Sequence, residues 1–131
     1  QSGDIYSRFE LEALKKVCEL NKDLIFYFYT KNLILFGHNH SIPNNMKVVA
    51  SYGGKYDYLI DRGYFKRFSK VVFSTNEAKL YNLPIDTDDT HAYMSKGANG
   101  FALLLHGTQE KGSKAGEALK EIKRNKKLVE V

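Results

Sequence analysis

The chain has 131 residues, of which 43% are hydrophobic, and a formal net charge of +5. A chain of this length folds as one domain around one core and needs no disulfide to stabilise it. The lone cysteine, Cys18, excludes an internal disulfide and a cysteine-based metal or iron–sulfur site, and we interpret it as a small core residue. Apolar runs stay well short of the roughly 20 residues that cross a bilayer. We therefore expect one soluble domain over residues 1–131 with no membrane partner.

The first residues are typical of the end of a strand. Ser2, Gly3 and Asp4 are small or polar, yet no strand precedes them, and the chain begins with Gln1. We expect the chain to be the C-terminal part of a longer protein, with an N-terminal segment missing. A sheet without its first strand has an open edge beside the next strand, so self-association is also expected.

Apolar runs alternate with helical patterns along the chain. Ser7 and Glu10 form a capping box that opens a predicted helix over residues 7–20. Short apolar runs, typical of strands covered on both faces, lie at residues 23–30, 47–51, 70–74 and 101–106. Helical or irregular stretches separate them at 56–65 and 74–82, and a basic helix is predicted at 111–127. The alternation predicts an α/β fold with a mostly parallel sheet of four to five strands and helical crossovers.

Small, polar and ionisable residues follow the predicted strands. Parallel strands end at one edge of a sheet, and ligands of α/β proteins bind there. We therefore expect one crevice to contain Ser2, Gly3, Asp4, Thr30, Lys31, Ser74 and His106. Asp4 is assigned as a base or ligand anchor, Lys31 as the partner of an anion, and His106 as a proton donor or metal ligand.

Residues 107–114 (GTQEKGSK) stand between a predicted strand and a predicted helix, as a phosphate-binding loop does. The Walker A pattern requires the lysine before the hydroxyl residue, whereas Ser113 here precedes Lys114. NTP hydrolysis is therefore not expected. Anion binding at the helix N-terminus, with Thr108 and Ser113 as ligands, stays open beside an ordinary turn.

The histidines and the acidic residues form no recognisable metal-binding set. The His-x-His pair at residues 38–40 lies in a polar loop, and the spacing of Asp88, Asp89 and His91 matches no closed set of ligands. Asp86 adds a third carboxylate, and crowded carboxylates can serve in acid–base chemistry. We interpret the cluster as a solvated loop, and no metal or other cofactor is assigned.

Three tripeptides occur in the order that they have in a known family: SGD at 2–4, YTK at 29–31 and HGT at 106–108. With these motifs the chain resembles the gene product 88 family of phage proteins over most of its length. The resemblance implies a half-barrel, similar to the second half of a radical-SAM barrel, in the cytoplasm of an infected or lysogenic host cell. Because the chain lacks the cysteine cluster of the first half, the resemblance does not extend to iron–sulfur or S-adenosylmethionine chemistry.

Two functions remain open, and the sequence does not decide whether the chain is an enzyme. The first is a half-barrel whose strand-end crevice binds a small anionic ligand or completes an active site shared with a missing segment. The alternative is a non-enzymatic module that binds nucleic acid or protein through its basic C-terminal helix, with Lys123, Arg124, Lys126 and Lys127 as contacts. Basic residues near a helix C-terminus are also favoured by the helix dipole without any ligand.

Overall fold

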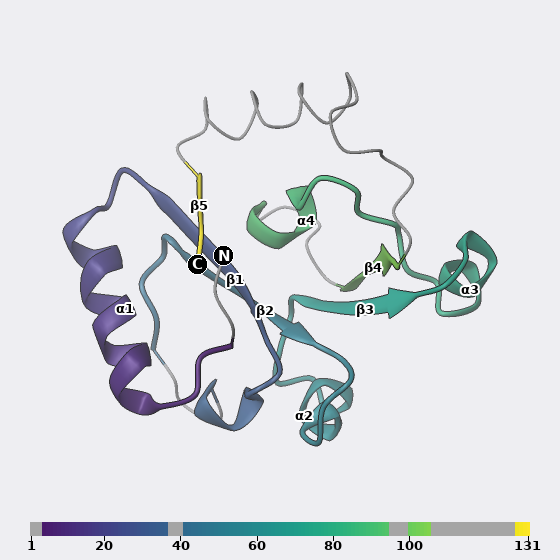
Figure 1. Ribbon diagram of the computed structural model, residues 1–131, viewed down its shortest axis with the longest axis horizontal. Coiled ribbons are helices and arrows are strands. Elements are labelled where there is room, and N and C mark those ends of the chain that lie inside the picture. Colours follow the sequence, from purple (N-terminus) through teal and green to yellow (C-terminus); the bar gives the residue numbers. More distant parts are fainter. Residues whose placement is uncertain (1–3, 37–40, 95–99, 106–127) are drawn as a thin grey trace.

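The computed structural model describes residues 4–36, 41–94, 100–105 and 128–131. The helices are α1 (Arg8–Leu20), η1 (Leu33–Phe36), α2 (Asp57–Asp61), α3 (Thr75–Leu80) and α4 (Thr90–Tyr93), and the strands are β1 (Ile25–Thr30), β2 (Met46–Ser51), β3 (Phe68–Val72), β4 (Gly100–Leu104) and β5 (Leu128–Glu130). All strand pairs among these residues are parallel, in the order β4-β3-β2-β1-β5. The sheet curls into a half-barrel (Figure 1), so the predicted α/β fold is confirmed.

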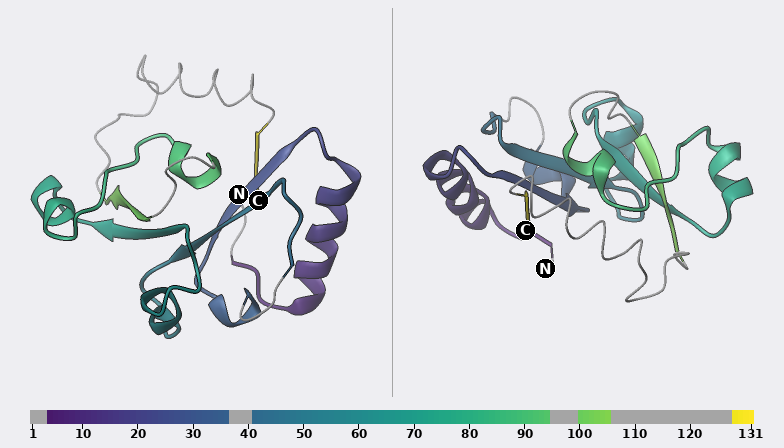
Figure 2. Two further views of the ribbon diagram at one scale, coloured as in Figure 1. Left: turned by 180° about the vertical axis from the view of Figure 1, so that it is seen from behind. Right: turned by 90° about the horizontal axis from the view of Figure 1, so that it is seen from above.

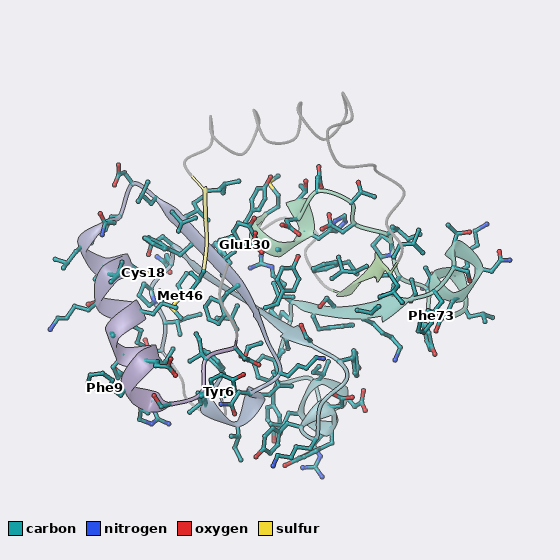
Figure 3. The ribbon with its side chains drawn as sticks, in the orientation of Figure 1. Tyr6, Phe9, Cys18, Met46, Phe73 and Glu130 are labelled. Carbon is teal, nitrogen blue, oxygen red and sulfur yellow. The ribbon has the colours of Figure 1, made fainter. Side chains whose placement is uncertain are left out.

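The helix α1 begins where the capping box predicts it. The Ser7 hydroxyl accepts a hydrogen bond from Glu10 N–H at 3.1 Å, and the Glu10 carboxylate accepts one from Ser7 N–H at 3.1 Å. Leu11 and Cys18 are fully buried against the sheet. Figure 3 shows Cys18 and Met46 between α1 and the sheet, whereas Phe9 points away. The expectation that Cys18 is a core residue is therefore correct.

The two faces of the sheet carry different cores because successive side chains of a strand point to opposite sides. On the convex face, α1, α2 and α3 cover residues such as Phe28, Ala50 and Val72. On the concave face, α4 packs on Tyr27 and Phe101. Figure 1 shows α4 inside the curl and the three longer helices around its outside.

The C-terminal strand β5 was not predicted, and it overturns the expected open edge. Leu128 pairs with Ile25 and Val129 with Phe26, so β5 lies on the free side of β1. Figure 2 shows the C-terminal end of the chain beside this part of the sheet from two further directions. The prediction of an exposed β1 edge is wrong, because this chain covers that edge with its own last residues. Self-association through that edge therefore has no structural support.

Smaller shifts occur at the strand boundaries. The third strand begins two residues earlier than predicted, at Phe68, and ends at Val72. Ser74 is then free to cap α3, which starts at Thr75. Among the residues described, no helix has the length and apolar character needed to span a membrane.

Candidate functional site

Asp4 lies at the carboxyl end of β1. Its Oδ1 accepts hydrogen bonds from Ile5 N–H at 2.7 Å and from the Thr30 hydroxyl at 2.5 Å, and its Oδ2 accepts one from Lys31 N–H at 2.8 Å. The structure thus brings together Asp4, Thr30 and Lys31, as the strand-end prediction requires. These donors engage both carboxylate oxygens, so Asp4 ties the segment before α1 to the end of β1.

Lys31 lies against the turn that follows β2. Gly53 has a φ of +112°, and a Cβ atom there would lie 3.3 Å from Lys31 Nζ, so glycine permits the close approach of the ammonium. The N–H groups of Gly53 and Gly54 donate to the Asp57 carboxylate at 3.1 and 3.0 Å. An anion at Lys31 would therefore meet the ammonium alone, since Asp57 already occupies the donors of this turn.

Ser74 lies just beyond the carboxyl end of β3, at the same edge of the sheet. Its hydroxyl accepts a hydrogen bond from Glu77 N–H at 3.1 Å, which makes it the N-cap of α3. The other residues that the sequence predicted for a site lie outside the described residues: Ser2, Gly3, His106, Thr108, Ser113, Lys123, Arg124, Lys126 and Lys127. The described part of the predicted crevice is therefore Asp4, Thr30, Lys31 and Ser74.

A cavity of about 660 Å³ lies between β2 and the segment that leads into β3. β2 pairs with β3 only through Ala50 and Ser51, so the first half of β2 stands apart from that segment. The residues that line it include Phe36, Met46, Val48 and Phe65 and three basic residues, Lys47, Lys66 and Arg67. We call this feature the basic cavity. A volume of this size is typical of sites for small molecules.

In the part of the chain that the structure describes, no carboxylate balances the positive charge of the basic cavity. Among these residues, no Asp or Glu lines the cavity, and Lys47, Lys66 and Arg67 form no ion pair with a carboxylate. Burial lowers the pKa of Lys47, and the neighbouring Arg67 charge lowers it further. Burial also lowers the pKa of Arg67. An anion in the cavity would stabilise both cations.

One nitrogen of the Arg67 guanidinium has a hydrogen-bond partner in the described part of the chain, and another does not. Its Nη2 donates a hydrogen bond to Met94 O at 2.5 Å, just after α4. Its Nε is buried without a hydrogen-bond partner in the described part of the chain. A buried donor without a partner costs folding free energy, about 1–3 kcal/mol.

The acidic cluster before α4 is not the solvated loop that the sequence suggested. Asp86 is only 4% exposed, and its Oδ1 lies 2.8 Å from His91 Nδ1. Burial raises the pKa of Asp86, although the hydrogen bonds and charge of His91 oppose that rise. Asp86 N–H donates to Ala102 O at 2.9 Å, which holds this segment along the outer edge of β4 and places the carboxyl inside the fold.

Two tyrosines of β1 extend this polar group across the concave face. The hydroxyls of Tyr27 and Tyr29 donate to the Asp89 carboxylate at 3.2 and 2.9 Å. Burial raises the pKa of Tyr29 strongly, and the Asp89 charge adds to the rise, so the phenol stays protonated as a donor. In the described part of the chain, no group of three or more His, Cys, Asp or Glu side chains is placed to hold a metal ion.

Sequence reasoning missed the residues of the basic cavity and misread Asp86. Lys47 begins one apolar strand run, and Arg67 precedes another. A charged residue at the start of a strand is the only sequence feature that pointed to either of them, and it is a weak indication of a site. The cavity itself depends on how β2 and β3 diverge, which no local pattern encodes. For Asp86, the acidic cluster was visible in the sequence, but the edge of β4 that buries it was not.

The comparisons with known proteins identify a family but no relative of established activity. No curated protein and no solved structure matches the chain. The expected likeness to a radical-SAM barrel therefore stays a prediction. A family model described as Gene product 88 matches residues 1–127. With nearly its whole length covered and the half-barrel in place, the chain belongs to the Gene product 88 family.

Proposed function

We propose that this half-barrel binds a small anionic ligand in the basic cavity. One observation carries the proposal: three basic residues line one cavity, and no described carboxylate forms an ion pair with them. Like charges in a partly buried site repel each other, so a structure without a ligand holds them at a cost in free energy. An anion bound beside these cations reduces that cost.

The walls indicate what kind of anion fits. Arg67 can donate two hydrogen bonds in a plane, which suits a carboxylate or a phosphate, whereas Lys47 and Lys66 act as point charges. Aromatic and aliphatic walls, including Phe36 and Phe65, leave room for an apolar part of the ligand. We therefore propose an organic phosphate or carboxylate as the class of ligand.

This site differs from the crevice expected from the sequence. The basic cavity lies beside the first half of β2, whereas Lys31 and Asp4 lie at the carboxyl end of β1. Asp4 already accepts three hydrogen bonds, which leaves Lys31 as the cation for a ligand at that edge. Anion binding at Lys31 therefore remains a second, weaker proposal for the same class of ligand.

The test uses pyrophosphate as the probe, with isothermal titration calorimetry on the full chain. Lys47→Met and Lys66→Met each remove one charge while keeping a similar length of side chain. A hydrogen bond to a charged group contributes about 1.5–3 kcal/mol, so each variant is expected to bind roughly tenfold or more weakly. Because burial lowers the pKa of Lys47, affinity should also fall as the pH rises towards the usual lysine pKa of 10.5.

Lys22→Met is the matched control, because Lys22 is exposed and lies outside the basic cavity. It removes the same net charge and should leave the affinity for pyrophosphate unchanged. Equal weakening in all three lysine variants would show a general charge effect and would overturn the proposal. Lys31→Met tests the strand-end crevice in the same titration.

A further inference from the structure

Asp86 is hydrogen-bonded to both the side chain and the backbone of His91, which is more than packing alone requires. Asp86 Oδ1 lies 2.8 Å from His91 Nδ1 and also accepts the His91 backbone N–H at 3.3 Å, so one carboxylate oxygen fixes both the ring and its backbone. The imidazole lies over the Phe101 ring, with centroids 5.4 Å apart and an interplanar angle of 30°. These contacts therefore fix both the position and the plane of the His91 imidazole.

The geometry also determines which ring nitrogen of His91 carries the hydrogen. An ionised Asp86 can only accept, so the neutral imidazole carries its hydrogen on Nδ1 and its lone pair on Nε2. The Asp86 side chain is 1% exposed, whereas the His91 side chain is 32% exposed. The His91 ring is therefore partly open to solvent, although its partner Asp86 is not. Among the described residues, none is hydrogen-bonded to Nε2.

Burying the Asp86 carboxylate costs folding free energy, which argues against a purely structural role. Its Oδ2 is buried and has no hydrogen-bond partner in the described part of the chain. Burying an ionised carboxylate costs several kcal/mol, and an apolar pair of similar size often stabilises a fold equally well or better. Ionisable groups whose pKa values are shifted by burial and a specific partner are found preferentially at functional sites.

The surroundings of His91 are polar and mostly acidic. Asp88 and Asp89 flank it on its own segment, and Asp88 accepts hydrogen bonds from Thr90. The hydroxyls of Tyr27 and Tyr29 reach Asp89 from β1, and β4 contributes only the uncharged Phe101. Negative charge on this side repels anions. The natural ligand at this position is therefore a neutral hydroxyl or a water molecule.

We propose that His91, oriented by Asp86, is a general base on the concave face that takes a proton from a hydroxyl-bearing small molecule or from water. The proton moves from the oxygen to Nε2, and the oxygen keeps the electron pair of the broken O–H bond. The hydrogen on Nδ1 stays in its bond to Asp86, whose negative charge stabilises the imidazolium. This proposal does not depend on the basic cavity.

The test measures the nucleophilic strength of Nε2 directly, with diethyl pyrocarbonate as the probe and mass spectrometry to locate modified histidines. Its rate at His91 should rise with pH to a plateau as the ring loses its proton. Asp86→Asn keeps the size and a hydrogen-bond acceptor but removes the charge, so the plateau rate should fall several-fold. Because burial raises the pKa of Asp86, its ionisation costs folding free energy at neutral pH, and the amide variant should fold.

Glu19→Gln is the matched control. It removes one negative charge from an exposed side chain of α1, on the convex side of the sheet, and it should leave the plateau rate unchanged. Nitrogen NMR of the wild-type ring should show hydrogen on Nδ1 in the neutral form. An unreactive His91, a plateau that Asp86→Asn leaves unchanged, or hydrogen on Nε2 would each overturn the proposal.

Discussion

At the residue scale, Asp4 shows how a side chain expected to act on a ligand can instead hold the backbone. Its carboxylate accepts from Ile5 N–H, the Thr30 hydroxyl and Lys31 N–H, and Thr30 is only 1% exposed. Asp4→Ala leaves the buried hydroxyl and the Lys31 N–H without their acceptor, so the free energy of unfolding should fall by about 1–3 kcal/mol in urea denaturation. Lys31→Met removes an exposed side chain and should change stability by less than about 0.5 kcal/mol. Equal stability of Asp4→Ala and wild type would contradict this structural role.

At the element scale, β5 decides whether the sheet has an exposed edge. It covers the β1 side of the sheet by parallel pairing at Ile25 and Phe26, and Val131 N–H donates to Tyr27 O at 3.0 Å. Removing residues 128–131 would leave backbone donors and acceptors of β1 unpaired, and such an edge favours association. The truncated chain should therefore be less stable and form larger species in light scattering than the full chain at the same concentration. A truncated chain that stays as monomeric and as stable as the full one would show that β5 contributes nothing to the edge.

At the scale of the whole molecule, one group of basic residues lines the basic cavity and another lies near the C-terminal end of the sequence. Reversing the charge of Lys123, Arg124, Lys126 and Lys127 should abolish any nonspecific binding of nucleic acid at low salt, since phosphate contacts give affinity that depends steeply on salt. The same variant should keep most of its affinity for pyrophosphate, because the cavity residues Lys47, Lys66 and Arg67 are unchanged. Unchanged nucleic-acid binding in a filter assay would remove the main support for the alternative function.

The amino-acid sequence alone was enough to predict the local elements and the class of fold. Periodicity, the capping box at Ser7 and the apolar strand runs depend on neighbours within a few residues, so α1, β1 and the parallel alternation could be predicted. Parallel strands share a carboxyl edge, and this rule predicted that Asp4 lies next to Lys31. The tertiary structure was needed to show which strand covers β1, where β2 separates from β3 to open the basic cavity, and how β4 buries Asp86. Those features join residues far apart in the chain, and their free energies depend on packing and desolvation that no local pattern contains.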